Sequence, residues 1–127
     1  MKKIENEIVQ KYVVSNKQER IKWELSNSKK REAISKHFHK PTIFKTECLY
    51  PINYMDKTEM QTYLYNLSKK SNVYFIGEDY IGDLSLKEAV ERASEGEICI
   101  IYCGEGIGYY QGEQEKGAPP RFMLVKK

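Results

Sequence analysis

The first forty residues repeat apolar side chains at the three- and four-residue spacing of amphipathic helices. This pattern predicts helices over residues 4–14, 17–25 and 28–39, with Ser28 as the N-cap of the third. Pro41 ends this helical part, because a proline disfavours helical backbone in the residue that precedes it. We therefore expect two or three helices before position 41.

Two capping boxes mark the starts of two further helices. Asp56 with Glu59 opens one of them, and Ser85 with Glu88 opens the other. In each pair the two side chains accept hydrogen bonds from backbone N–H groups at the start of the helix. Gly96 is the expected C-terminal stop of the second of these helices.

Stretches rich in β-branched and aromatic residues predict a small sheet. These stretches are 42–50, 72–77, 97–103, 107–113 and 121–126. The order strand, helix, strand over 72–103 predicts a parallel pair with a right-handed crossover. The last two stretches predict a hairpin across QEKGAPP. The predicted fold class is α+β, with N-terminal helices packed on a small mixed β-sheet that has one βαβ crossover and a C-terminal antiparallel hairpin.

Length and composition indicate one globular domain, with a helical part at 1–40 and a sheet part at 41–127. The chain has 127 residues, of which 40% are hydrophobic and 31% are charged. No apolar run approaches the roughly 20 residues that span a membrane. The N-terminus MKKIENEIVQ lacks the apolar core of a secretory signal. Together these features predict a cytoplasmic protein without a membrane partner.

The net charge of +3 is unevenly distributed along the chain. Residues 1–40 hold eleven Lys and Arg against five Glu, whereas residues 41–127 hold ten against thirteen acidic residues. A basic front part indicates either an anionic partner or docking of one half of the chain on the other.

The basic residues of the front part are the first candidate site. Arg20, Lys30 and Arg31 are candidate phosphate contacts, since Lys30 and His37 share a face if residues 28–39 are helical. Trp23 is a candidate for stacking on a base if it is exposed. An ordinary solvated helical face explains the same pattern.

The glycine-rich stretch CGEGIGYYQGE at 103–113 is the second candidate site. Exposed backbone N–H groups can bind phosphate, which makes Gly104, Tyr110 and Glu113 candidate ligand residues. The spacing matches neither a dinucleotide fingerprint nor a P-loop, and a tight hairpin is the simpler interpretation. Tyr109 and Tyr110 alternate along a strand, so one of them is expected in the core and the other at the surface.

Side chains that carry catalytic chemistry are few. His39 is the candidate acid or base of an enzyme, and Cys103 near a histidine is a second, less specific possibility. His37 and His39 point in nearly opposite directions on a helix, so no metal site is predicted. No cofactor motif is present. An odd count of three cysteines indicates thiols rather than a disulfide framework.

The stretches QERIKWELSNSKKREAISKHFH and LSLKEAVERASEGEICIIYCGEGIGYYQGE, followed by RFML, resemble a family of small bacterial proteins with no assigned activity. The resemblance covers residues 17–40 and 84–124. The resemblance implies no activity and no cofactor. It implies only which positions are expected to be important. Those positions are Arg20, Lys30, Arg31, His39, Gly104, Tyr110, Gly112, Glu113 and Arg121.

Three functions remain open at this point. The first is a cytoplasmic binding protein whose basic N-terminal helices meet nucleic acid, a nucleotide-like ligand or an acidic protein surface. The second is a small enzyme for a phosphorylated substrate, with His39 near the strand end at Gly104. The third is a protein–protein adaptor anchored by exposed tyrosines.

Overall fold

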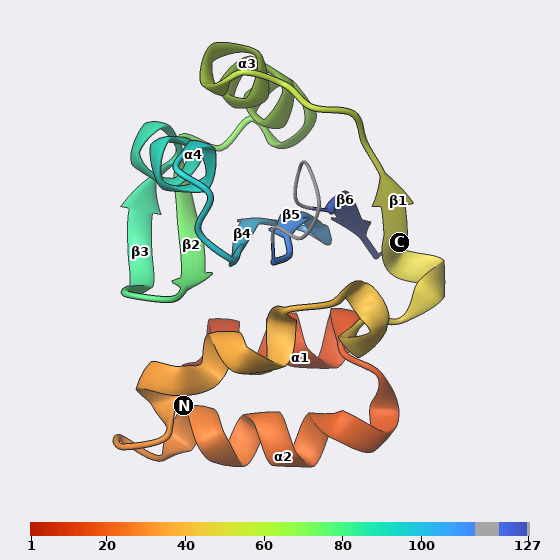
Figure 1. Cartoon of the computed structure of the whole chain (residues 1–127), viewed down its shortest axis with the longest axis vertical. Coiled ribbons are helices and arrows are strands. Elements are labelled where there is room, and N and C mark those ends of the chain that lie inside the picture. The colour runs from red at the N-terminus through yellow and green to blue at the C-terminus, as the bar shows by residue number, and fades with distance from the viewer. Residues whose placement is uncertain (114–119, 127) are drawn as a thin grey trace.

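The computed structural model describes residues 1–113 and 120–126. Its six strands form one sheet with helices on both faces (Figure 1). The helices α1 (Lys3–Tyr12) and α2 (Ser15–Ser26) lie on one side, whereas α3 (Lys57–Ser68) and α4 (Leu86–Ser94) lie on the other. The predicted α+β fold class is confirmed.

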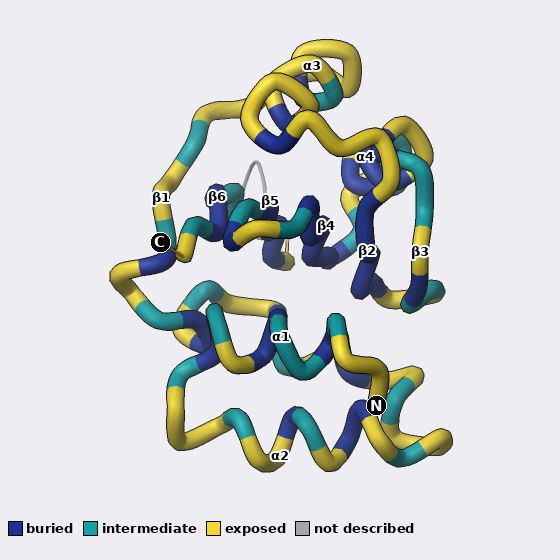
Figure 2. The backbone as a smooth tube through the Cα atoms, turned by 180° about the vertical axis from the view of Figure 1, so that it is seen from behind, coloured by how far each residue is buried: buried dark blue, intermediate teal, exposed yellow. Residues whose placement is uncertain are grey.

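The two N-terminal helices follow the predicted apolar spacing. Ile8 and Tyr12 of α1, and Ile21 and Leu25 of α2, are all buried in the core between the helices and the sheet. α1 lies closer to the sheet than α2, whose outer face is largely exposed (Figure 2). The apolar stripe of each helix is therefore what holds this layer on the sheet.

The third predicted helix is a 3₁₀ helix, η1 (Arg31–Phe38), with non-helical backbone at Ala33 (φ −102°, ψ 16°). Ser28 is not its N-cap. The side chain of Asn27 instead accepts backbone N–H groups at 3.0 and 3.2 Å and closes a turn over residues 28–30. In a 3₁₀ helix, side chains three apart eclipse and those seven apart do not. The expected shared face of Lys30 and His37 is therefore wrong.

Residues 42–50 are mostly not a strand, contrary to the sequence-based prediction. They form the short 3₁₀ turns η2 (Pro41–Ile43) and η3 (Thr46–Cys48), followed by β1 (Leu49–Pro51). The backbone of this segment bonds to the end of α1 and not to the sheet, since the N–H of Lys45 donates to Tyr12 O at 2.8 Å. Only β1 joins the sheet.

The sheet has the strand order β1-β6-β5-β4-β2-β3, and every neighbouring pair is antiparallel. The other strands are β2 (Asn72–Gly77), β3 (Ile81–Ser85), β4 (Cys99–Gly104), β5 (Ile107–Gln111) and β6 (Arg121–Val125). The C-terminal antiparallel pair of β5 and β6 is confirmed. Six residues of its predicted connection, 114–119, lie outside the described residues.

The expected mixed sheet is wrong, because the sequence pattern missed the strand β3. Residues 78–80 turn the chain back, so that β3 pairs antiparallel with β2. α4 then carries the chain across β2 to β4, which also pairs antiparallel with β2. A crossover helix is present as predicted, but it joins β3 and β4, which run parallel on either side of β2.

Both faces of the sheet are buried, each in a core of its own. Along β5, Tyr110 belongs to the core under α1 and α2, and Tyr109 belongs to the core under α3 and α4. Their side chains are 0% and 1% exposed, so the expectation that one of the pair faces solvent is wrong. Alternation along a strand separates the two faces, but with helices on both faces neither side meets water.

The helices of the second face begin where the capping boxes predict. Asp56 caps α3 and accepts the N–H of Glu59 at 2.9 Å, and Ser85 caps α4 and accepts the N–H of Glu88 at 3.1 Å. Gly96 follows α4 with a φ of +94°, as a helix stop requires.

Candidate anion-binding site

Arg31, a candidate phosphate contact, forms an internal ion pair. Its guanidinium donates to both carboxylate oxygens of Glu5 on α1, with a distance of 2.8 Å to Oε1. The hydroxyl of Tyr74 on β2 donates to the same carboxylate, which is fully buried. Burial alone would raise the pKa of Glu5, but the hydrogen bonds from Arg31 and Tyr74 outweigh it and hold the pKa below its usual value. Arg31 therefore fastens η1 to α1 and the sheet.

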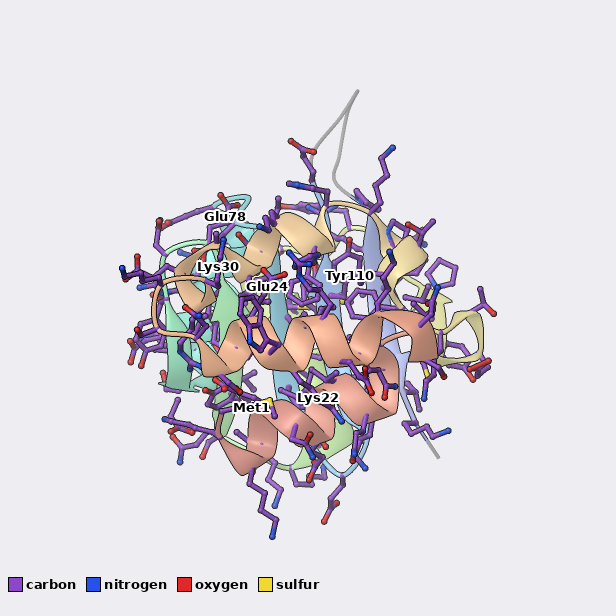
Figure 3. The ribbon with its side chains drawn as sticks, turned by 90° about the horizontal axis from the view of Figure 1, so that it is seen from below. Met1, Lys22, Glu24, Lys30, Glu78 and Tyr110 are labelled. Atoms are coloured by element: carbon purple, nitrogen blue, oxygen red, sulfur yellow. The ribbon has the colours of Figure 1, made fainter. Side chains whose placement is uncertain are left out.

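A second fully buried carboxylate, that of Glu24 on α2, forms ion pairs with basic side chains from two helices. Its Oε2 accepts Nε of Arg20 at 2.6 Å and lies 3.0 Å from Nε2 of His37, while Oε1 lies 3.7 Å from Nζ of Lys36. Burial would raise the pKa of Glu24, but Arg20 and His37 lower it below its usual value. Figure 3 shows Glu24 where α2 and η1 meet.

The ionised Glu24 fixes the hydrogen-bonding state of His37. A carboxylate only accepts hydrogen bonds, so Nε2 of His37 carries the proton that it shares with Glu24. In the neutral imidazole, the lone pair then lies on Nδ1. The pair thus holds the ring of His37 in one tautomer and one orientation, as in other carboxylate–histidine pairs.

Beyond His37, a cleft of about 300 Å³ opens between α2, the end of η1 and the end of β5. The charged side chains that line it are Lys17, Lys40 and Glu113, and the imidazoles of His37 and His39 line it as well. Within the part of the chain that the structure describes, Lys17 and Lys40 make no ion pair, and both are exposed. Nδ1 of His39 lies 3.7 Å from Oε2 of Glu113. One carboxylate thus faces two lysines and two histidines, which makes the cleft electropositive.

The end of β5 positions one wall of this cleft. The hydroxyl of Tyr110 donates to Phe38 O at 2.6 Å, and the N–H of Glu113 donates to His39 O at 2.9 Å. A Cβ at Gly112 would lie 2.8 Å from the same His39 oxygen, so a glycine lets the two backbones approach. The sequence YYQGE therefore docks the sheet on the end of η1, and Tyr110 is a buried support beneath the cleft.

Gly104 lies at the other end of β5, away from His39. The two central residues of the turn from β4 to β5, Glu105 and Gly106, have positive φ, as tight two-residue hairpins require, and so does Gly104 at the end of β4. The length of β5, five residues or about 17 Å, separates this turn from the cleft. The hairpin interpretation of the glycine-rich stretch is confirmed. The expected proximity of His39 and Gly104 is wrong.

Lys30 and Arg121 are not brought to the cleft either. Lys30 is exposed in the turn before η1, and in Figure 3 it lies on the side of Glu24 away from Tyr110. Arg121 lines a cavity of about 40 Å³ with Tyr109, on the opposite face of the sheet. Its guanidinium carbon lies 5.1 Å from the ring centroid of Tyr54. Of the predicted site residues, the cleft thus contains His39 and Glu113, and Arg20 is linked to it only through Glu24 and His37.

Cys103 is separated from both histidines by the sheet. Its side chain lies in the core under α3 and α4, where burial raises the pKa of the thiol to about 11. The suggested pairing of Cys103 with a histidine is therefore wrong. Among residues 1–113 and 120–126, no three Cys, His, Asp or Glu side chains lie close enough together to hold a metal ion.

A larger depression, about 730 Å³, adjoins the cleft through Thr42. Its lining is mainly apolar, and its two charged side chains, Lys45 and Glu47, have opposite signs. It therefore has no net charge that would select an ionic ligand. Of these two hollows, the smaller cleft is the one lined by groups that can bind an anion.

Sequence reasoning missed three side chains that define this region: Lys17, Glu24 and Glu5. A signal for Lys17 and Glu24 was present, since they are seven apart on α2 and Arg20 lies between them at helical spacing. Glu5 lies three and four residues before Ile8 and Val9, and Glu24 lies three residues after Ile21, so helical spacing puts both carboxylates on the buried apolar face of their helix. A carboxylate in such a position needs basic partners. The partners, Arg31 and His37, come from η1, and no local pattern reveals them.

Comparisons of the chain with protein families, with curated proteins and with solved structures found no match. None of the helices in the described part of the chain is both long enough and apolar enough to cross a membrane. The resemblance to a bacterial family and the cytoplasmic location stay predictions.

Proposed function

We propose that this protein is a cytoplasmic binding protein whose cleft between α2, η1 and β5 takes an anionic group, of which phosphate is the best fit. The observation that supports this function is the lining of the cleft, in which Lys17, His37, His39 and Lys40 face one carboxylate, Glu113. Donors from α2 and from the residues that follow η1 converge there, namely Lys17, His39 and Lys40, and the lysines are exposed and unpaired among the described residues.

The buried ion pairs favour this cleft over the rest of the basic surface. The guanidinium of Arg31 is paired with Glu5, and Nε of Arg20 donates a hydrogen bond to Glu24. These pairs fix η1 against α1 and α2, so the cleft is formed before a ligand arrives. A preformed site loses less side-chain freedom on binding than an isolated run of surface lysines does.

Inorganic tripolyphosphate is a suitable probe, since it offers charge without any organic group. Its affinity would be measured by isothermal titration calorimetry at low and at physiological salt, with the wild type and with the double variant Lys17→Gln/Lys40→Gln. A hydrogen bond to a charged group contributes about 1.5–3 kcal/mol, so we expect the double variant to bind at least about tenfold more weakly.

The matched control is Lys70→Gln/Lys87→Gln, which lowers the net charge equally. Lys70 follows α3 and Lys87 lies on α4, both exposed in the layer on the other face of the sheet. We expect this control to bind tripolyphosphate nearly as the wild type does. Equal losses in the two double variants would show that only net charge matters and would refute the cleft as a site.

A second candidate function is an enzyme that acts on a phosphorylated substrate. The observation that favours it is the pairing of His37 with Glu24, because a carboxylate that fixes the tautomer of an imidazole is the usual arrangement of a general base. In this case His37, and not His39, is the acid or base. The variant His37→Gln should then abolish turnover of a panel of phosphate monoesters, whereas tripolyphosphate binding should fall far less than in Lys17→Gln/Lys40→Gln. A wild type without turnover would refute this candidate.

A further inference from the structure

We infer that the ligand of the cleft is single-stranded nucleic acid, with phosphates in the cleft and a base stacked on Trp23. This inference rests on the proposed function and extends it along α2. Its starting point is the exposure of Trp23, whose indole is 53% exposed although tryptophan is the largest apolar side chain in the chain. A lone exposed ring is ordinary on a protein surface, and Trp23 differs from exposed rings such as Tyr65 in lying on α2, the helix that supplies Lys17 to the cleft.

Trp23 carries a cation at its face, which suits a nucleotide. The guanidinium carbon of Arg20 lies 5.9 Å from the ring centroid. The side chain of Arg20 is 65% exposed, and its bond to Glu24 uses Nε, one of five donors. A stacking ring beside a solvent-facing cation is the pair by which proteins bind unpaired bases together with their phosphates.

A chain of contacts links Trp23 with the cleft. Trp23 meets Arg20, Arg20 bonds to Glu24, and Glu24 bonds to His37, which lines the cleft. Lys17, also in the cleft, lies six residues before Trp23 on the same helix, or about 9 Å along its axis. That length exceeds twice the ~3.4 Å spacing of nucleotides in a stacked strand. The ligand must therefore span several nucleotides, more than a single mononucleotide offers.

The charges along this path are predominantly positive. The basic side chains on it are Lys17, Arg20, Lys36, His37, His39 and Lys40. Against them stand Glu113, the exposed Glu19 one turn before Trp23 on α2, and the buried Glu24, which is already shared by Arg20, His37 and Lys36. Such a path follows a phosphate backbone and reads no base edges, so binding should depend little on sequence.

A duplex fits this surface less well than a single strand does. The faces of duplex bases are stacked on one another, and presenting one to Trp23 requires that it be unstacked first. The carboxylates of an acidic protein surface would satisfy the lysines, but they offer Trp23 no ring on which to stack. The combination of a basic path and an exposed indole thus favours an unpaired strand.

The single tryptophan of the chain provides a direct assay. Trp23 fluorescence would be followed while oligo(dT) of about ten nucleotides, its RNA counterpart, the corresponding duplex, polyphosphate of matched charge and polyglutamate are titrated in turn. We expect saturable quenching by either single strand, weaker binding of the duplex, and polyphosphate binding with little quenching.

Variants measured by fluorescence anisotropy of labelled oligonucleotide complete the test. Trp23→Leu should lower the affinity for the single-stranded oligonucleotide about tenfold and leave the affinity for tripolyphosphate unchanged. The control Tyr65→Leu removes an exposed ring from α3, in the layer across the sheet, and should have no effect.

The outcomes distinguish this inference from the function on which it rests. Equal affinity for oligonucleotide and polyphosphate, with no effect of Trp23→Leu, would overturn the inference and leave the anion cleft standing. Polyglutamate that binds as tightly as oligo(dT) would overturn it in favour of an acidic protein. If Lys17→Gln/Lys40→Gln bound tripolyphosphate as tightly as the wild type does, the proposed function itself would be refuted.

Discussion

Replacing Arg31 with methionine tests whether this residue holds the N-terminal helices to the sheet or is reserved for a ligand. Methionine keeps most of the apolar length of the side chain but cannot donate to Glu5. The carboxylate, 0% exposed, would then stay buried with the hydroxyl of Tyr74 and the N–H of Lys2 as its remaining donors. A buried charge that loses its partner is strongly destabilising.

The magnitude follows from the burial of the pair. Removing one partner of a buried ion pair costs about 3–5 kcal/mol, and Arg31 is 25% exposed, so water can reach the site that it leaves. We therefore expect Arg31→Met to lower the free energy of unfolding by about 3 kcal/mol. For a chain of this length that corresponds to a fall in Tm of roughly 10 °C or more.

Urea unfolding followed by far-UV circular dichroism measures the change, with the slope m as a check that both states are comparable. The neighbouring variant Lys30→Met removes an exposed charge and should stay within about 0.5 kcal/mol of the wild type. The double variant Glu5→Gln/Arg31→Met should recover part of the loss, because a neutral amide is easier to bury. A loss below about 1 kcal/mol in Arg31→Met, equal to that of Lys30→Met, would refute the assignment.

Two further predictions concern pH and backbone conformation. Because the pKa values of Glu5 and Glu24 are lowered from 4.5, their contribution to stability is complete above that pH and is lost as the pH falls through the folded-state values. Urea titrations at several acidic pH values should show this fall, and Glu24→Gln should make it shallower; an unchanged slope would contradict the buried charge. Gly106→Ala should destabilise more than Gly96→Ala, as compared by thermal unfolding. Both have positive φ, but a Cβ at Gly106 would overlap the carbonyl oxygen of Lys126, whereas none lies within 4 Å at Gly96; equal Tm shifts would contradict this account.

Local features of the fold were predictable from the sequence because their causes are local. Asp56 and Ser85 bond to backbone N–H groups three residues away, so the starts of α3 and α4 can be read directly. The hairpin at Glu105 and Gly106 depends on residues that accept positive φ. Buried thiols such as Cys103 follow from the apolar run around them.

Pairing of strands was beyond the local pattern. β3 is only five residues long and contains Gly82 and Asp83, which weaken its resemblance to a strand. Without it, the order strand, helix, strand indicates a parallel pair, and with it β2 and β4 become antiparallel neighbours. Likewise η1 has the apolar spacing of an α-helix but is a 3₁₀ helix, and the bonds of Arg31 and Tyr110 anchor its two ends to distant parts of the chain.

In the candidate site, too, some features follow from the local sequence and others depend on the tertiary structure. The sequence by itself determined that basic residues gather in the N-terminal helices, and that His39 and Glu113 are chemically notable. Only the tertiary structure decided which of these residues remain available to a ligand. A buried carboxylate binds the nearest cation, and the nearest cation in space can lie 26 residues away in the chain, as Arg31 does from Glu5. Charge is a property of the sequence, but the partner that each charge acquires depends on how the layers pack.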